Sequence, residues 1–114
     1  MKGRTRKFAI AVIKFARTLP RDPVTDVIVR QLVKSSSSVG ANYRASCRAR
    51  SKPDFIAKLG IVEEESDESL FWLEVLVEAG MVKAEAVAKL LDEAEQLVRI
   101  IVAAINTARG GHRS

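Results

Sequence analysis

Residues 51–80 read SKPDFIAKLGIVEEESDESLFWLEVLVEAG, and this segment carries the strongest fold signal in the chain. Ser51 and Asp54 form a capping-box pattern, in which the Ser51 hydroxyl accepts a backbone N–H and Asp54 reaches back. Gly80 is a residue type that favours a helix C-terminus. Between these ends, apolar and small residues recur at steps of three and four, as on one face of an α-helix. They are Phe55, Leu59, Val62, Ser66, Ser69, Leu73 and Leu76.

Three more stripes with the same spacing flank this segment. They comprise Phe8, Val12, Phe15 and Leu19; Ile28, Leu32, Ser35, Val39, Asn42, Ser46 and Ala49; and Val87, Leu91, Ala94, Val98, Ile101, Ile105 and Ala108. Pro20 and Pro23 separate the first two stripes, and Asp22 can start the second helix. The predicted helices cover residues 4–19, 23–50, 52–80 and 84–109, all within one domain spanning residues 1–114. Short connections between them predict an all-α, antiparallel up-down-up-down four-helix bundle.

The composition excludes several classes of protein. With 47% hydrophobic and 29% charged residues, the chain of 114 residues is neither disordered nor a membrane protein. One cysteine excludes an internal disulfide and fits the reducing cytoplasm, where we expect the protein to be located. The N-terminal basic and apolar segment is too short for a secretory core and is interpreted as mature structure.

The sequence also argues against catalysis. The one histidine is His112, in the C-terminal tail. The carboxylates of Glu63, Glu64, Glu65 and Glu68 therefore lack the Glu-x-x-His partners of di-iron bundles. Cys47 has no candidate base nearby in sequence, and the chain has no phosphate loop or dinucleotide fingerprint. We expect a non-enzymatic protein without a metal or other cofactor.

Charge is divided unevenly along the chain. Residues 1–58 contain fourteen basic and three acidic residues, a net charge of +11, whereas residues 59–114 contain five and eleven, a net charge of −6. The basic part could bind a polyanion such as RNA or DNA. It could equally bind the acidic part of a second copy in a closed oligomer. A third interpretation is that both parts are solvated helix faces.

Polar residues in the two central helices predict buried contacts. If these helices form a hairpin, Gly40 and Gly60 lie at one level, which suggests a close backbone approach between them or against another subunit. Lys34 and serine hydroxyls would lie near Glu65 and Glu68, which predicts a buried polar layer. The alternative is that the serines bond back to the preceding turn. Further core positions are Asn42, expected to fix the register, and Trp72, expected to be a core or interface anchor.

Two groups of cations are candidate binding residues. Arg44 and Arg48 are spaced i, i+4 and predict a basic ridge that pairs with acids of an adjacent subunit or with phosphates. Arg48 could also meet Asp54 across the hairpin. The second group lies on and after the first helix and predicts weakly sequence-specific binding of RNA or DNA. It consists of Arg4, Lys7, Lys14, Arg17 and Arg21.

Two linked motifs resemble a known family. Residues 38–44 read SVGANYR and are similar to the S-[IV]-G-A-N-x-R signature of 23S rRNA-intervening-sequence proteins. Residues 48–76 are similar to that family's R-x-x-S-x-x-D-F-x-x-K-L-x-I-x-x-x-E-x-x-E-x-x-[YF]-W-L-E-x-L pattern. Glu64, Ala45 and Leu70 depart from the expected residues, which puts some surface charge partners in doubt.

The resemblance implies an up-down bundle that assembles as a homopentameric ring. Genes of this family often lie within large-subunit rRNA genes, and rRNA binding is mostly inferred from that location. A related branch comprises accessory proteins of diversity-generating retroelements, which bind nucleic acid and a reverse transcriptase. The expected function is therefore binding of structured RNA or DNA by an oligomer. The alternative is a protein-interaction module with such a protein partner.

Overall fold

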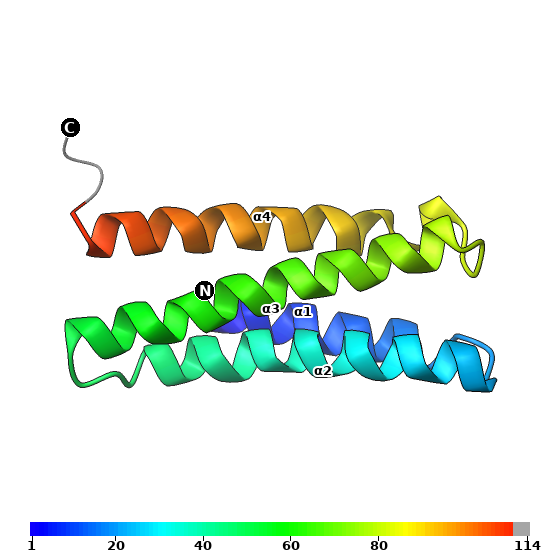
Figure 1. Cartoon of the computed structure of the whole chain (residues 1–114), viewed down its shortest axis with the longest axis horizontal. Coiled ribbons are helices and arrows are strands. Elements are labelled where there is room, and N and C mark those ends of the chain that lie inside the picture. The colour runs from blue at the N-terminus through cyan, green and yellow to red at the C-terminus, as the bar shows by residue number, and fades with distance from the viewer. Residues whose placement is uncertain (111–114) are drawn as a thin grey trace.

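The structure is a computed structural model that describes residues 1–110, so His112 lies outside the described residues. It contains four helices and, within that range, no strand: α1 (Lys2–Ala16), α2 (Pro23–Ser46), α3 (Lys52–Glu78) and α4 (Ala84–Ala108). Each helix contacts the next, and α1 also contacts α4. Figure 1 shows that successive helices run in opposite directions. The predicted antiparallel four-helix arrangement is confirmed.

Local signals in the sequence set several helix ends. Asp22 accepts the backbone N–H groups of Val24 and Thr25 at the start of α2. Ser51 accepts the N–H of Asp54 at the start of α3, as predicted. The Asp54 carboxylate does not complete the capping box, because it accepts a hydrogen bond from Lys58 at 2.7 Å. Gly80 has a φ of +75° and follows the end of α3, as expected of a C-terminal glycine.

Two helices end three or four residues earlier than predicted. The first helix ends at Ala16 instead of residue 19, and α2 ends at Ser46 instead of residue 50. The N–H groups after each end bond to carbonyls three residues back, as Thr18 does to Phe15 and Arg48 to Ala45. This tightened geometry ends the α-helical hydrogen-bond pattern. Arg48 therefore lies in the turn after α2 and not on the helix itself.

The predicted stripes form the core. Its completely or nearly completely buried hydrophobic residues are Phe8, Val12, Leu32, Val39, Leu59, Val62, Leu73, Leu76, Val87, Ala94, Leu97, Ile101 and Ile105. Leu97 is the one member outside the predicted stripes. None of the helices within residues 1–110 combines the length and apolar character that crossing a membrane requires.

Serine hydroxyls of the predicted polar layer are buried, whereas two of the charged residues predicted with them are not. Ser35 and Ser69 are fully buried, and Ser69 donates a hydrogen bond to Ser35 across α2 and α3 at 3.0 Å. Ser35 in turn donates to the carbonyl oxygen of Leu32, one turn back. Lys34 and Glu68 are exposed instead of buried. A serine hydroxyl can be buried because it donates a hydrogen bond to a carbonyl oxygen of its own helix. Burying a carboxylate, in contrast, carries a large desolvation cost.

Gly40 and Gly60 do not approach each other within one chain, and the alternative that they approach another subunit stays a prediction. A Cβ on Gly40 would lie 3.5 Å from the carbonyl oxygen of Thr5, so the close approach is to α1. A Cβ on Gly60 would meet nothing within 4 Å. Asn42 does not bridge helices, because its amide donates to the carbonyl and hydroxyl oxygens of Ser38, one turn back. These hydrogen bonds lie within one helix, so they do not fix the register between two helices.

Candidate nucleic-acid interface

The charge division along the chain becomes a division between the two helical hairpins. Residues 1–50, which include α1 and α2, contain twelve Lys or Arg and two Asp or Glu residues. Residues 51–110, which include α3 and α4, contain six and twelve, respectively. One side of the bundle is therefore strongly basic and the other acidic. Any polyanion would be attracted to the α1–α2 side.

Two of the predicted nucleic-acid-binding residues are engaged within the chain. The guanidinium group of Arg4 donates to both carboxylate oxygens of Glu93, at 2.7 and 2.8 Å, and to Gln96 at 2.7 Å. The hydrogen bond to Glu93 is the main reason that the pKa of Arg4 is raised. Arg4 therefore links α1 to α4 and is occupied in this conformation. Arg21 lies 3.4 Å from Asp26, but it remains largely exposed.

The other three predicted cations of this group are accessible. Lys7, Lys14 and Arg17 are exposed on or just after α1. None of them forms an ion pair within residues 1–110. They remain available to an anion, and Arg30 of α2 lines a hollow together with Arg17.

A second set of cations gathers at the end of the bundle that carries the α2–α3 turn. Two adjoining hollows of about 600 and 590 Å³ lie there and share Ala41, Arg44 and Arg48. We call the unpaired cations that line them the turn-end cluster. It consists of Lys2, Arg6, Arg44, Arg48 and Arg50. None of these side chains forms an ion pair with another part of the described chain.

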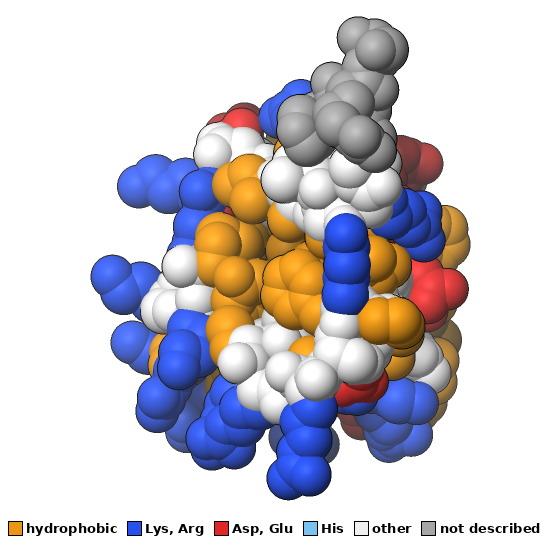
Figure 2. All heavy atoms as spheres, turned by 90° about the vertical axis from the view of Figure 1, so that its left-hand side faces the viewer, with side chains coloured by type: hydrophobic (Ala, Val, Ile, Leu, Met, Phe, Trp, Pro, Cys, Tyr) orange, Lys and Arg blue, Asp and Glu red, His pale blue; other side chains and the backbone are white. Residues whose placement is uncertain are grey.

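Three separate segments bring the turn-end cluster together. Lys2 and Arg6 are spaced i, i+4 on α1, Arg44 lies in the last turn of α2, and Arg48 and Arg50 follow in the turn. Figure 2 looks at this end and shows Lys and Arg side chains around much of its rim, with hydrophobic side chains in the middle. The predicted Arg44–Arg48 ridge therefore exists, although the helix does not continue through it.

The predicted contact between Arg48 and Asp54 does not form. Asp54 also lines the second hollow, but its carboxylate is bound to Lys58. Arg48 has no ion-pair partner among the described residues. The hydrogen bond within one turn of α3 satisfies Asp54, and this leaves Arg48 free for a ligand.

Small residues form part of the floor of the first hollow. Gly3, Ser37, Gly40 and Ala41 line it between the cations. Because these side chains are short, a bulky anion can approach the helices closely and reach several cations at once. Lysine and arginine bind phosphate oxygens by charge and hydrogen bonding without reading base sequence. The cluster is therefore suited to a phosphate backbone.

The comparisons with known proteins identify the family. The sequence profile of the family described as "23S rRNA-intervening sequence protein" matches residues 2–103. The chain belongs to this family. The resemblance seen in its two motifs is thereby confirmed. A search among curated protein sequences gives no match.

A solved relative supports the same assignment. It is the crystal structure of a protein with unknown function from the S23 ribosomal protein family of Bacteroides thetaiotaomicron. The two structures superpose with a TM-score of 0.85 at 27% sequence identity, over 91% of this chain and 96% of that one. The four-helix architecture is therefore shared between this 23S rRNA-intervening sequence protein and a solved relative.

The aromatic pair of this 23S rRNA-intervening sequence protein lies on α3, away from the turn-end cluster. Trp72 is half-buried, and Phe71 contacts it edge to face, with ring centroids 4.9 Å apart. The indole Nε1 is buried without a hydrogen-bond partner in the part of the chain that the structure describes. A half-buried ring fits the expected role of a core or interface anchor better than that of a platform for stacked bases, and this role stays a prediction. Phe71, by contrast, is 52% exposed.

The pKa of Glu65 predicts how the stability of this protein depends on pH. Burial raises the pKa of Glu65 above its usual value of 4.5, and the neighbouring Glu68 adds to the rise. The folded state thus holds this proton more tightly than the unfolded state. The contribution of Glu65 to the free energy of unfolding is therefore highest below pH 4.5, and it falls as the pH rises through the raised pKa of Glu65. We expect Glu65→Gln to be more stable than the native protein at pH 7 and to lose that advantage in acid.

Urea unfolding at pH 3.5 and at pH 7 measures this difference. The matched control is Glu95→Gln, which changes an exposed carboxylate on α4. An equal stability difference at both pH values for Glu65→Gln would contradict the proposed cause.

Proposed function

We propose that this protein is a non-enzymatic, self-assembling binder of structured RNA or DNA, acting in the cytoplasm. Its turn-end cluster would contact the phosphate backbone, without strong preference for sequence. The observation that carries the proposal is the gathering of five unpaired cations around two joined hollows. Nonspecific binding to phosphates of this kind typically has dissociation constants of about 10⁻⁴–10⁻⁶ M.

Self-assembly would strengthen this binding. A homopentameric ring, as the family resemblance implies, would carry five turn-end clusters on one particle. A long polyanion could then contact several clusters at once, and each further contact would be intramolecular. The strong charge division between the hairpins supports assembly, because basic and acidic surfaces of separate copies attract one another.

A gel shift with a structured RNA hairpin tests the proposal. We expect the full chain at tens of micromolar to retard the RNA in 50 mM salt. Five released counterions predict that affinity falls by about 10²–10³-fold between 50 and 200 mM salt. Unchanged mobility in low salt at that protein concentration would refute nucleic-acid binding.

One observation favours a second candidate function, a protein-interaction module such as a retroelement accessory protein that binds a reverse transcriptase. Phe71 is a large hydrophobic residue that remains exposed among acidic side chains of α3. Exposed aromatic residues of this kind are frequent anchors of protein interfaces. Retention of a co-expressed reverse transcriptase on the tagged protein, with no retention of RNA, would favour this candidate.

A further inference from the structure

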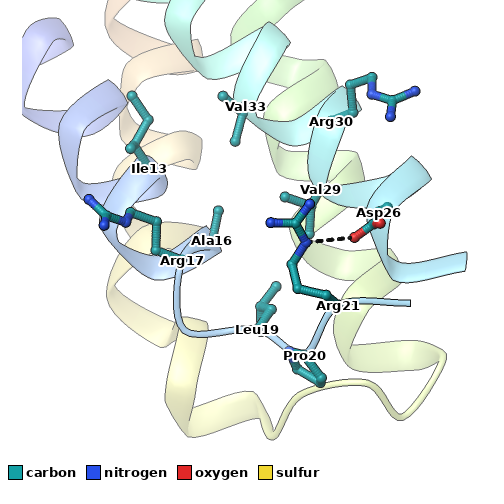
Figure 3. A pocket seen from close by; sticks show the side chains of 10 residues that line it. All are labelled: Ile13, Ala16, Arg17, Leu19, Pro20, Arg21, Asp26, Val29, Arg30 and Val33. Carbon is teal, nitrogen blue, oxygen red and sulfur yellow. Dashed lines mark ion pairs between the residues drawn. The ribbon is translucent and has the colours of Figure 1, made fainter. Parts of the chain in front are cut away.

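A groove with aliphatic side chains between two helices and charged side chains around them lies between α1 and α2, at the end of the bundle opposite the turn-end cluster. Leu19, Pro20, Arg21 and Asp26 line part of this hollow of about 410 Å³. The rest of its lining consists of Ile13, Ala16, Arg17, Val29, Arg30 and Val33. We call these six residues the α1–α2 groove. Figure 3 shows the aliphatic side chains between the two helices, with Arg17 and Arg30 directed away on either side. Ile13 is 39% exposed, so part of this apolar surface faces solvent.

The charges around the groove favour an acidic occupant. Arg17 and Arg30 form no ion pair within residues 1–110. The one acid that lines the groove, Asp26, is already bound to Arg21. A phosphate backbone would satisfy the cations but would leave the aliphatic floor uncovered. An amphipathic helix with acidic side chains would cover both.

The chain itself presents such a helix face. Phe71 is 52% exposed on α3, and its ring is held against Trp72. Acidic residues at helical spacing from Phe71 project from the same outward side of α3. They are Glu64, Asp67, Glu68, Glu74 and Glu78. With Phe71 they make up what we call the Phe71 face.

The carboxylates of the Phe71 face lack partners in a single copy. None of the five forms an ion pair within the described chain. The five positions lie seven, four and three residues before Phe71 and three and seven residues after it, so they surround the ring along the helix. An aromatic anchor encircled by charges of one sign is complementary to aliphatic side chains flanked by charges of the opposite sign.

We propose that the Phe71 face of one copy docks into the α1–α2 groove of a second copy. This inference rests on the self-assembly part of the proposed function and names the surfaces that would carry it. Because the groove and the face are different surfaces of the chain, the contact is head to tail and can continue around a closed ring. The turn-end cluster lies at the other end of the bundle and stays free for nucleic acid.

Charge reversal on each surface tests the proposal. A groove variant carries Arg17→Glu and Arg30→Glu, and a face variant carries Glu68→Arg and Glu74→Arg. All four side chains are exposed, so both variants should keep the native helical content by circular dichroism. We expect the native full chain to sediment as an oligomer at 100 µM, whereas each variant alone sediments as a monomer. Mixing the two variants restores opposite charges at the contact, and we expect oligomers to form again.

Matched controls distinguish the effect of losing the contact from the effect of changing the net charge. Lys83→Glu with Lys89→Glu changes the charge as the groove variant does, and Glu85→Arg with Glu95→Arg changes it as the face variant does. These four residues are exposed at or on α4. We expect both controls to remain oligomeric. A Phe71→Ala variant should weaken self-association at least about tenfold, as loss of an aromatic anchor does.

The possible outcomes distinguish this inference from the proposed function. If either reversed variant keeps the native oligomer, or if the mixture stays monomeric, the docking inference is wrong while self-assembly through other surfaces stands. If the native chain itself is a monomer at 100 µM, both the inference and self-assembly are wrong. RNA binding is measured separately by the gel shift, and a monomer keeps its own turn-end cluster, so a monomeric result would weaken RNA binding without refuting it.

Discussion

Replacing Arg44 and Arg48 together with glutamate should lower the affinity for a structured RNA by about 10²–10³-fold in 50 mM salt. Each of these side chains is unpaired in the described chain, and both line the two joined hollows. Loss of a charged hydrogen bond costs about 1.5–3 kcal/mol, and the new carboxylates would repel phosphates as well. The slope of the logarithm of the affinity against the logarithm of the salt concentration should decrease in magnitude by about one unit for each lost phosphate contact.

The control for this prediction keeps the net charge equal. Lys83→Glu with Lys89→Glu removes two exposed cations near the α3–α4 connection, far from the turn-end cluster along the bundle. We expect its affinity for the same RNA to stay within about threefold of the native value at 150 mM salt, where exposed charges more than about 10 Å apart are screened. Gel shifts or fluorescence anisotropy measure both variants and the native protein at 50 and at 150 mM salt, and losses are compared at the same salt concentration. Equal losses for both would mean that RNA responds to overall charge and not to this cluster.

Replacing Leu73 with alanine should lower the free energy of unfolding by about 2–5 kcal/mol. Leu73 has no exposed surface and belongs to the stripe of α3 that packs in the core. The substitution removes buried methyl groups and leaves a cavity that the surrounding helices fill only in part. A domain of this size is stable by about 5–15 kcal/mol, so the loss is a large fraction of the total.

Urea unfolding followed by circular dichroism measures this loss, at one protein concentration because self-assembly would add to apparent stability. Val24→Ala is the matched control, since Val24 is 66% exposed at the start of α2. We expect its effect to stay within about 0.5 kcal/mol. If Leu73→Ala is as stable as Val24→Ala, Leu73 does not have the core position that the structure gives it.

The fold followed from local patterns in the sequence. Each stripe, such as Leu59 to Leu76 in α3, repeats with the period of the helix, so the buried face can be identified without any neighbour. Asp22, Ser51 and Gly80 act on backbone groups within a few residues of themselves, and the structure confirms all three as helix-end signals. The early end of α2 was missed, because the tightened turn after Ser46 has no strong breaker in the sequence.

The candidate site was predicted only in part. Arg44 and Arg48 were identified by their spacing, but Lys2, Arg6 and Arg50 were not connected with them. The i, i+4 spacing of Lys2 and Arg6 was a usable signal, yet it does not say which end of another helix these residues approach. Arg4 was expected to be free, and its pairing with Glu93 joins residues 89 positions apart in the sequence.

The sequence alone thus determines what depends on neighbours along the chain: the helices, their buried faces and the charge of each half. The tertiary structure is needed for what depends on neighbours through space. It shows that Gly40 packs on α1, that serines and not carboxylates form the polar layer, and which arginines remain unpaired. The physical reason is that a side chain's burial and ion-pair partners are set by the packing of helices whose residues are far apart in sequence.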